Sequence, residues 1–449
     1  MDPHEIHHRI LVNLAKQIRE GGIKDREKFI NNIITECLPD RKEDQQVYHA
    51  VEKRLNFLLD ERKDAPPLVE IMEDVCPDCG PDLHPCTEIC PTEAITCTGG
   101  IRHINRDRCI ECGQCINVCI SGAIMARSEF AQVATMLLQS DTHPVYAILA
   151  PSFVGQFGPQ ATPEIFKSAL KAMGFTEIYE VALAADITTL FEAEEFSQRM
   201  ERGEKFMITS CCCPAFIKFI EKLRPKVANL VSPTVSPMIA LGKMLKQREE
   251  NCRVVFIGPC IAKKNEAKRP DLQPAVDCVL TFKETKALLE AAEIKLDGSL
   301  GRMDLTDASH DGRIYAHTGG VTEAIIRAVQ RRDHRLSVKP VKGNGLKQCG
   351  ELLQQIEEGT IQANFMEGMG CPGGCIGGPG TLIKVEEAAP YVQNFADRSP
   401  FDTPNDNPTA IQWMEDYYKM TDTLSEKMSL KTEHAPSPAY PHPSGEYLS

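Results

Sequence analysis

Three short loops, in which cysteines stand against glycine or proline, constrain this 449-residue chain more than any other feature. The loops are Thr209-Ser210-Cys211-Cys212-Cys213-Pro214, Gly258-Pro259-Cys260 and Gly370-Cys371-Pro372-Gly373-Gly374-Cys375. Adjacent cysteines are poorly placed for mutual disulfides, and thiolates held on tight turns suit a soft metal. One thiol from each of the first two loops and two from the third make the four that an iron–sulfur cube requires. The alternative is three unrelated loops that carry buried free thiols.

Residues 70–127 hold eight more clustered cysteines in two runs. The second run, Cys109-x-x-Cys112-x-x-Cys115-x-x-x-Cys119, has the spacing of bacterial ferredoxins, in which the fourth thiol binds the neighbouring cube. The first run follows the same logic, with a loop inserted at 80–85. The spacing predicts two 4Fe-4S cubes, one held by Cys76, Cys79, Cys86 and Cys119, and the other by Cys90, Cys109, Cys112 and Cys115.

Two points about these runs stay open. A zinc site is the alternative to the cubes, although zinc would not need the crossover spacing. The inserted loop could also change which thiol serves the first cube. Cys97 falls outside the pattern, and we expect it to be a packing thiol.

Composition and charge limit the kinds of partner and the cellular compartment that we expect. The net charge of −13 argues against nucleic acid or an anionic membrane as the main partner. We find no apolar signal core and no stretch of about 20 apolar residues. The cysteines cluster as metal ligands do, and not as a secreted disulfide framework. We therefore expect a cytoplasmic protein.

The pattern along the chain predicts four regions: a helical arm at 1–66, a ferredoxin-like domain with two 4Fe-4S cubes at 67–140, an α/β domain at 141–390, and a helix with a disordered tail at 391–449. Short apolar runs predict strands at 145–149, 178–181, 206–208 and 254–257, with a further strand at 314–316. Several of these runs lead into a loop and then a helix, which is where open α/β folds carry their sites. The arm is expected to cap the next domain or to bind a partner.

Charged residues precede the first loop. Glu192, Glu195 and Arg199 fall at i, i+3 and i+7, on one face of a predicted helix. Spacing alone is typical of a solvated charged face. Lys263, taken alone, is typical of a surface lysine.

The three loops, in this order behind a ferredoxin-like segment, resemble the signature motifs of the iron-only (FeFe) hydrogenases, over roughly residues 76–380. The resemblance implies an H-cluster, which is a 4Fe-4S cube joined to a two-iron subsite with carbon monoxide, cyanide and a dithiolate bridge. It assigns the cube to Cys213, Cys260, Cys371 and Cys375, with Cys375 as the bridge to the two-iron subsite.

The resemblance also implies roles for other residues. A gapless count from Pro214 matches the family's proton pathway to Glu192, Glu195, Arg199 and Ser232, and its proton-donating cysteine to Cys212. Lys263 would bond one cyanide and Ser152, after Pro151, the other; Met369 would also contact the cofactor. A count from Thr209-Ser210 instead moves each role in the first loop back by one residue, so that Cys211 becomes the donor and Cys212 the ligand.

The chain departs from the family pattern at several positions. Gly258 stands where methionine is usual, Met238 where glutamine is usual and Phe216 where tryptophan is usual, and the third motif ends in Gly377-Gly378-Pro379. These departures indicate a divergent branch of the family, such as the sensory hydrogenases.

The resemblance predicts reversible interconversion of protons, electrons and dihydrogen. Two 4Fe-4S cubes would relay electrons from a ferredoxin-like carrier, and hydrogenase maturation proteins would supply the cofactor. The alternatives are a hydrogen-sensing protein with slow turnover and an iron–sulfur assembly or scaffold protein without the two-iron subsite. The matched proton-pathway residues argue against the scaffold, which has no need of them.

Overall fold

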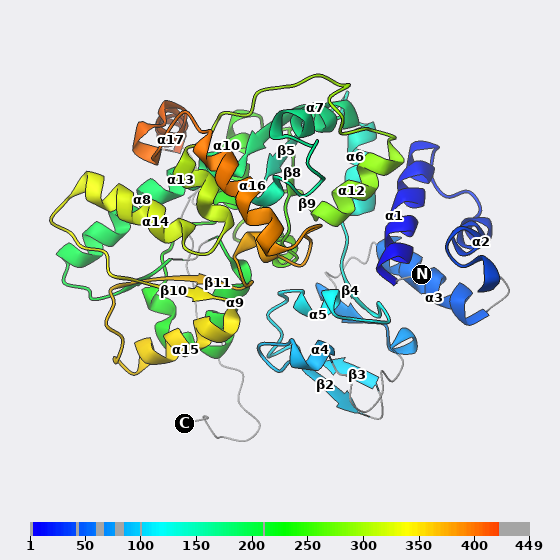
Figure 1. Ribbon diagram of the computed structural model, residues 1–449, viewed down its shortest axis with the longest axis horizontal. Coiled ribbons are helices and arrows are strands. Elements are labelled where there is room, and N and C mark those ends of the chain that lie inside the picture. The colour runs from blue at the N-terminus through cyan, green and yellow to red at the C-terminus, as the bar shows by residue number, and fades with distance from the viewer. Residues whose placement is uncertain are drawn as a thin grey trace.

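The computed structural model describes residues 3–41, 45–59, 67–76, 85–98, 101–209 and 212–421. Two residues with predicted roles, Cys79 and Cys211, lie outside the described residues, and so does the predicted tail. Figure 1 shows three parts: N-terminal helices at one end, a small cysteine-rich part beside them, and a larger part with two sheets.

The N-terminal arm is helical, as predicted. Its helices are α1 (Pro3–Arg19), α2 (Arg26–Cys37) and α3 (Gln45–Leu59). The face of α1 that carries Ile10, Leu11 and Leu14 is buried, and α1 packs on α6 (Phe130–Leu138) and α12 (Phe282–Ala291). The arm therefore packs directly on the α/β part as well as beside the cysteine-rich part.

The cysteine-rich part contains two small antiparallel pairs and two short helices. They are β1 (Val69–Ile71) with β4 (Ile124–Ala126), β2 (Ile95–Thr98) with β3 (Ile101–Ile104), α4 (Pro85–Glu88) and α5 (Gln114–Asn117). The prediction that Cys97 is a packing thiol is wrong, because its side chain is exposed. Cys97 lies on β2 in a two-stranded ribbon, and of that strand only Ile95 is buried.

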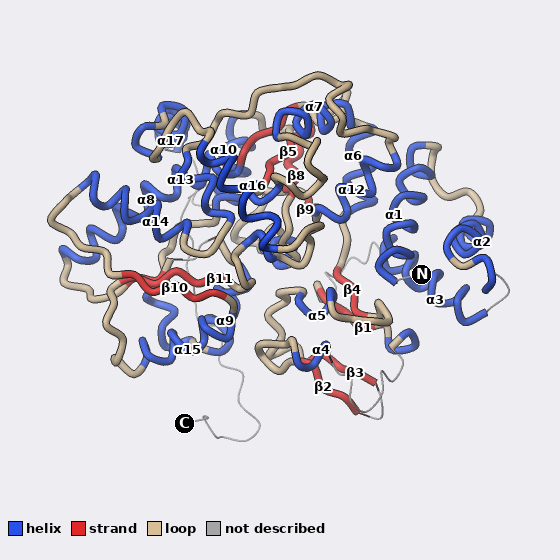
Figure 2. The backbone as a smooth tube through the Cα atoms, in the orientation of Figure 1, coloured by secondary structure: helices blue, strands red, loops and turns tan. Residues whose placement is uncertain are grey.

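Two parallel sheets form the α/β part, and Figure 2 shows them as separate groups of strands. The first has the order β6-β5-β8-β9, with β6 (Glu177–Glu180), β5 (Val145–Leu149), β8 (Arg253–Ile257) and β9 (Cys278–Leu280). The second has the order β10-β11-β7, with β10 (Pro340–Asn344), β11 (Phe365–Met369) and β7 (Met207–Ile208). Most central-strand residues are buried, as the continuous apolar runs of parallel strands require.

Helices surround both sheets. In chain order they are α7 (Pro163–Met173), α8 (Val181–Glu201), α9 (Pro214–Leu223), α10 (Pro237–Arg248), α11 (Ala262–Glu266), α13 (His310–Arg313), α14 (Gly320–Arg332), α15 (Leu346–Glu357), α16 (Val385–Asp397) and α17 (Pro408–Thr421). Helix α8 packs against α10 and α14, and most of its residues are buried. Helix α16 crosses residue 390, where the sequence suggested a boundary.

The strand predicted at 314–316 is wrong, since these residues form a 3-10 turn. Ser309 caps α13 by accepting a hydrogen bond from the Gly312 N–H, and the helical turn then continues to Ala316. A capped helix start five residues upstream outweighs the short apolar run.

The arrangement of the strands explains where the loops meet. Strands β7, β8 and β11 lead directly into the first, second and third cysteine loops, and β5 leads into Pro151-Ser152. All four loops leave the carboxyl ends of parallel strands. Open α/β folds place their sites at these ends, and here two sheets contribute to one site.

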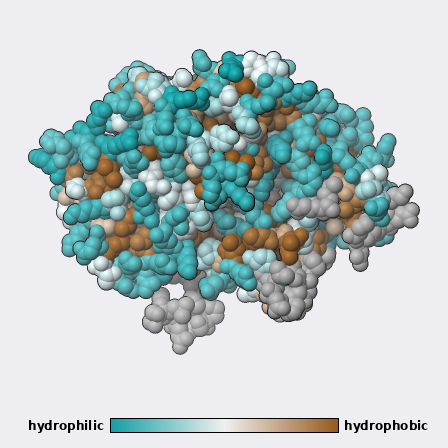
Figure 3. Space-filling view, in the orientation of Figure 1, coloured by the Kyte–Doolittle hydropathy of each residue, from teal (hydrophilic) through white to brown (hydrophobic). Residues whose placement is uncertain are grey.

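The surface view in Figure 3 is mostly hydrophilic, with separate hydrophobic patches. Across the part of the chain that the structure describes, no helix is both long enough and apolar enough to span a membrane.

Candidate functional site

Four thiols come together where the loops meet: Cys213, Cys260, Cys371 and Cys375. Burial raises the pKa of Cys260, and the thiols of Cys213 and Cys375 add to the shift. Burial and Cys213 likewise raise the pKa of Cys375 to about 11. The Gly370 N–H donates to Cys213 Sγ at 3.3 Å, a type of hydrogen bond that tunes iron–sulfur centres. The three loops therefore form one cluster of thiols.

A second group lies in the cysteine-rich part and contains Cys90, Cys109, Cys112 and Cys115. Burial raises the pKa of Cys112 to about 12, with further contributions from Cys90 and Cys109. Burial, and then these neighbouring thiols, raise the pKa of Cys115 well above its ordinary value. The Ala94 N–H donates to Cys90 Sγ at 3.2 Å. Cys90 comes from the first run, so this group has the predicted crossover membership.

A third group contains Cys76, Cys86 and Cys119. Burial raises the pKa of Cys86, and the other two thiols add to that shift, Cys119 more than Cys76. The Ile124 N–H donates to Cys119 Sγ at 3.4 Å. The predicted fourth ligand, Cys79, lies outside the described residues.

The second group of thiols lies next to the four thiols of the three loops. The thiols of Cys112 and Cys371 interact electrostatically, and Gln114 Nε2 donates to Cys371 Sγ at 3.2 Å. Gly113, between Cys112 and Gln114, has a φ of +79°, and a Cβ there would lie 2.8 Å from Ile261. Glycine at 113 therefore allows the cysteine-rich loop to approach the second cysteine loop closely.

The thiol groups do not have the geometry of single-ion sites. Within the described ranges, no three His, Cys, Asp or Glu side chains are arranged to hold one metal ion. An iron–sulfur cube does not require such convergence, because each thiolate binds a different iron. The donor set, with four thiols in each of two groups and N–H donors to sulfur, fits cubes.

Glu192 is fully buried on α8, so the expectation of a solvated charged face from spacing alone is wrong. Its carboxylate accepts a hydrogen bond from Thr209 Oγ1, and Thr209 is the first residue of the first cysteine loop, directly after β7. Buried carboxylates are rare in protein cores. Helix α8 thus presents an acid to the residue that begins the loop carrying Cys212.

The other predicted pathway residues lie along the same side of α8. Arg199 Nε donates to Glu195 Oε1 at 2.7 Å, and the two guanidinium nitrogens donate to the backbone carbonyls of Leu230 and Val231 at 3.0 and 3.2 Å. These carbonyls immediately precede Ser232, which is fully buried. Arg199 therefore fixes Glu195 and the segment before Ser232 together.

Lys263 is buried, so the expectation of a surface lysine from sequence alone is wrong. Its side chain is 7% exposed, and Nζ bonds to Glu266 Oε2 at 2.8 Å. Burial opposes the charge, but Glu266, Cys260 and Cys212 raise the pKa of Lys263 above its ordinary value. The ammonium group stays charged and lies near the thiols of the first two loops.

The loop after β5 supplies a hydroxyl. Ser152 is fully buried, and among the described residues its Oγ has no hydrogen-bond partner. Pro151 precedes it in a 3-10 turn. A buried hydroxyl of this kind is available to a bound group that donates or accepts a hydrogen bond. Met369 is buried at the end of β11. These observations fit the predicted cofactor contact of Ser152.

One departure from the family pattern, glycine in place of methionine at 258, has a local explanation. A Cβ at Gly258 would lie 2.5 Å from the ring of Phe256 and 2.9 Å from the Ala150 Cβ. The Phe256 ring fills the space that a methionine side chain would need at this position. Met238 and Phe216, two other departures, are buried apolar residues.

Sequence reasoning missed four residues of the site. Thr209 contacts Glu192, Glu266 pairs with Lys263, and Gln114 bonds to Cys371. Glu111 accepts from Lys218 Nζ and from Asn265 Nδ2, and so joins the cysteine-rich part to α9 and α11. Only Glu266 had a local signal, since it stands three residues after Lys263; the others depend on contacts between distant segments.

Comparisons with known proteins agree with this arrangement. The family model described as the iron-only hydrogenase large subunit, C-terminal domain, matches residues 143–379. A second model, the LdpA Fe-S cluster-binding domain, matches residues 71–130.

Among curated relatives, the chain is 29% identical over 378 residues to the NADP-reducing hydrogenase subunit HndD of Solidesulfovibrio fructosivorans, covering 69% of this chain and 63% of that protein. It is 30% identical over 369 residues to iron hydrogenase 1 of Clostridium pasteurianum, covering 62% and 64%. The chain thus spans less than two thirds of the length of these relatives. It is also 23% identical to the nuclear prelamin A recognition factor of Xenopus laevis, covering 72% of this chain and 86% of that protein.

A solved structure shows the same fold. The apo FeFe-hydrogenase HydA1 of Chlamydomonas reinhardtii aligns with a TM-score of 0.56 at 21% identity, covering 68% of this chain and 99% of that one.

Proposed function

Because the chain belongs to the iron-only hydrogenase large-subunit family, we propose that it is a hydrogenase that interconverts protons, electrons and dihydrogen at an H-cluster. Two 4Fe-4S cubes in the cysteine-rich part would relay electrons from a ferredoxin-like carrier. The H-cluster cube would be held by Cys213, Cys260, Cys371 and Cys375. When bound, the two-iron unit supplies the metal chemistry of hydrogen activation.

One observation carries the proposal: a fully buried acid, Glu192, bonds to Thr209 at the start of the loop that holds Cys212. A cube that only transfers electrons has no need of a buried carboxylate. A proton relay needs titratable groups within hydrogen-bond steps of one another. In this proposal Cys212 exchanges the proton nearest the metal, and Glu192 passes it outward.

Ser232 and Glu195 would continue the path, with Arg199 as a positioning residue. Arg199 keeps the Glu195 carboxylate and the backbone before Ser232 in fixed positions through three hydrogen bonds. Charge-assisted hydrogen bonds of this kind give geometric specificity as well as energy. Glu195 is 14% exposed, so it is the pathway acid nearest to solvent.

Lys263 and Ser152 would hold the cofactor. A buried ammonium group suits an anionic cyanide because Coulomb attraction is strong away from water. The hydroxyl of Ser152, which has no partner in the part of the chain that the structure describes, would bond to the second cyanide.

A second candidate function follows from the resemblance to the nuclear prelamin A recognition factors. The alignment with one of these proteins covers 86% of its length. Here the chain would be an iron–sulfur protein that carries cubes but no two-iron subsite. A hydrogen sensor with slow turnover would share the first candidate's cofactors and differ only in rate.

Infrared spectroscopy of anaerobically matured protein separates these candidates. The hydrogenase and the sensor should both show carbonyl and cyanide bands, whereas the second candidate should show none. Iron and sulfide analysis before maturation should give about twelve irons, since three cubes carry four each. About four irons would contradict the two-cube relay, and absent bands with full iron would contradict the hydrogenase.

A further inference from the structure

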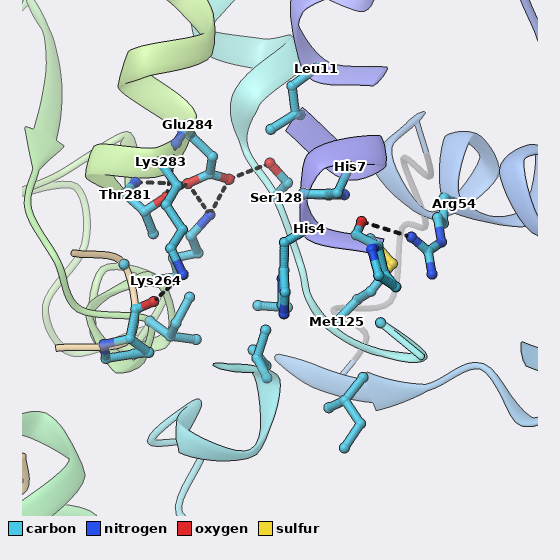
Figure 4. A pocket seen from close by; sticks show the side chains of 18 residues that line it. His4, His7, Leu11, Arg54, Met125, Ser128, Lys264, Thr281, Lys283 and Glu284 are labelled. Carbon is cyan, nitrogen blue, oxygen red and sulfur yellow. Dashed lines mark hydrogen bonds and ion pairs between the residues drawn. The ribbon is translucent and has the colours of Figure 1, made fainter. Parts of the chain in front are cut away.

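The N-terminal arm inserts a buried cation into the cysteine-rich part. Arg54, on α3, is 5% exposed. Its Nη2 donates to the backbone carbonyl of Ser121 at 2.8 Å, and its Nη1 donates to the carbonyl of Pro3 at 3.3 Å. Figure 4 shows Arg54 at the edge of a cavity of about 90 Å³ between the arm and the rest of the protein.

The charge of this guanidinium has no carboxylate partner among the described residues. Both of its hydrogen-bond acceptors are neutral backbone carbonyls. Charged side chains are almost never buried without a counter-charge, because the loss of hydration is costly. A buried arginine in this setting requires a source of negative charge nearby.

The thiol of Cys119 interacts electrostatically with Arg54, and so does the imidazole of His7. Ser121, whose carbonyl Arg54 binds, stands two residues after Cys119, and its Oγ lies 3.6 Å from Cys119 Sγ. Gly122 also packs against the guanidinium, since a Cβ there would lie 2.8 Å from Arg54 Nη2. Arg54 thus lies over the turn that follows a predicted cube ligand.

We propose that Arg54 is the counter-ion of the 4Fe-4S cube that Cys119 helps to hold, and that it raises the reduction potential of that cube. The inference rests on the iron–sulfur part of the proposed function and not on its hydrogen chemistry. Through Arg54, the arm would influence electron transfer at this cube as well as pack against the rest of the protein.

The direction of the effect follows from charge. A cube with four thiolate ligands is anionic, and one-electron reduction adds one more negative charge to it. A fixed cation nearby stabilises the reduced form more than the oxidised form, and net charge around a cluster is one of the factors that set its potential. His7 and His4, which line the same cavity, are not needed for this effect.

The test is a redox titration of the full chain, loaded anaerobically with iron and sulfide, and followed by electron paramagnetic resonance. The signal that disappears in Cys119→Ala identifies the cube. Arg54→Gln should keep full iron and lower the midpoint potential of that signal, leaving the other cubes unchanged. Arg54→Lys keeps the charge, so its midpoint potential should stay close to that of the parent protein.

A matched control separates charge from attachment of the arm. Arg9, on α1, bonds to Glu290 of α12 at 2.9 Å, and its other ion-pair partners among the described residues, Glu5 and Glu36, belong to the arm itself. Arg9→Gln weakens the arm's docking and should leave the potential unchanged.

Three outcomes would overturn the proposal: an unchanged potential in Arg54→Gln, an equal shift in Arg54→Lys, or an equal shift in Arg9→Gln. If Arg54→Gln loses the cube, retention of the cube by Arg54→Lys would support the counter-ion role of Arg54. Loss of the cube in both variants would contradict that role. Failure of all variants and the parent to bind iron would count against the proposed function itself.

Discussion

At the scale of single residues, adjacent cysteines in the first loop have different surroundings. Cys213 occupies the N-cap position of α9 and accepts a hydrogen bond from the Gly370 N–H. Cys212 is buried and interacts with Lys263. The neighbouring thiols of Cys260 and Cys375 interact with Cys213, which favours the register that makes Cys213 the cube ligand.

The register predicts different losses for the two cysteines. With Cys213 as the ligand, Cys213→Ala would remove a metal bond, so the H-cluster cube should fail to assemble. With Cys212 as the proton donor, Cys212→Ala would leave the metal bonds intact, so the infrared bands should remain while turnover falls on the order of 10²-fold or more. Hydrogen-evolution assays and infrared spectra of both variants check this, with Cys211→Ser expected to be nearly neutral. If Cys212→Ala destroys the cluster and Cys213→Ala spares it, the alternative register holds.

Lys263 gives a second test at this scale. Lys263→Ala removes the buried ammonium group, so we expect weaker uptake or retention of the two-iron unit with the cubes intact. Infrared band intensity per mole of iron measures that loss. Lys268→Ala is the control, because Lys268 pairs with Glu129 and not with the loops. Unchanged bands and turnover in Lys263→Ala would remove Lys263 from the site.

At the scale of elements, the third loop is tied to a helix start. Glu367 on β11 is fully buried, and its carboxylate accepts from the N–H groups of Gly319 and Thr322 and from Thr322 Oγ1, at 2.6–2.8 Å. An acceptor at a helix N-terminus satisfies N–H groups that have no partner within the helix. Glu367 therefore couples α14 to the strand that positions Cys371.

Replacing this carboxylate should cost stability. In Glu367→Gln one oxygen becomes an NH₂ group, which would face a donor, so we expect the free energy of unfolding to fall by about 1–3 kcal/mol. Chemical denaturation measures it. Glu323→Gln on the exposed side of α14 is the control and should change stability little. An unchanged free energy of unfolding in Glu367→Gln would mean that the cap does not contribute to stability.

The elements also show what the sequence could predict. Strands such as 145–149 and 254–257 were predictable, because continuous apolar runs there lead directly into loops of glycine, proline and cysteine. Strand β10, Pro340–Asn344, has one strongly apolar residue, so its pattern carried no strand signal. The grouping of neighbouring thiols in the cysteine-rich part was predictable from spacing, whereas the bond from Gln114 to Cys371 joins segments 257 residues apart and has no local signature.

At the scale of the whole molecule, the arm meets both other parts at the cavity of Figure 4. His7 lies there on α1, and the groups that face it are His4 of the same helix, Arg54 of α3, Lys264 of α11 and Glu284 of α12. Burial, followed by the charge of Arg54, lowers the pKa of His7 to about 4. The folded chain therefore keeps this imidazole neutral under conditions in which an unfolded chain protonates it.

The shift predicts a pH dependence of stability with a definite sign. Between about pH 4 and 6.5 the unfolded chain binds the His7 proton and the folded chain does not, so stability falls as the pH falls through this window. His7→Gln removes the titration, and its loss of thermal stability from pH 7.5 to 5.5 should be smaller than the parent's. His49→Gln, on the exposed side of α3, should behave as the parent does. Because effects of pH on the cubes are common to all three proteins, they cancel in the comparison. An identical loss in parent and His7→Gln would show that the arm's docking does not depend on the neutral imidazole.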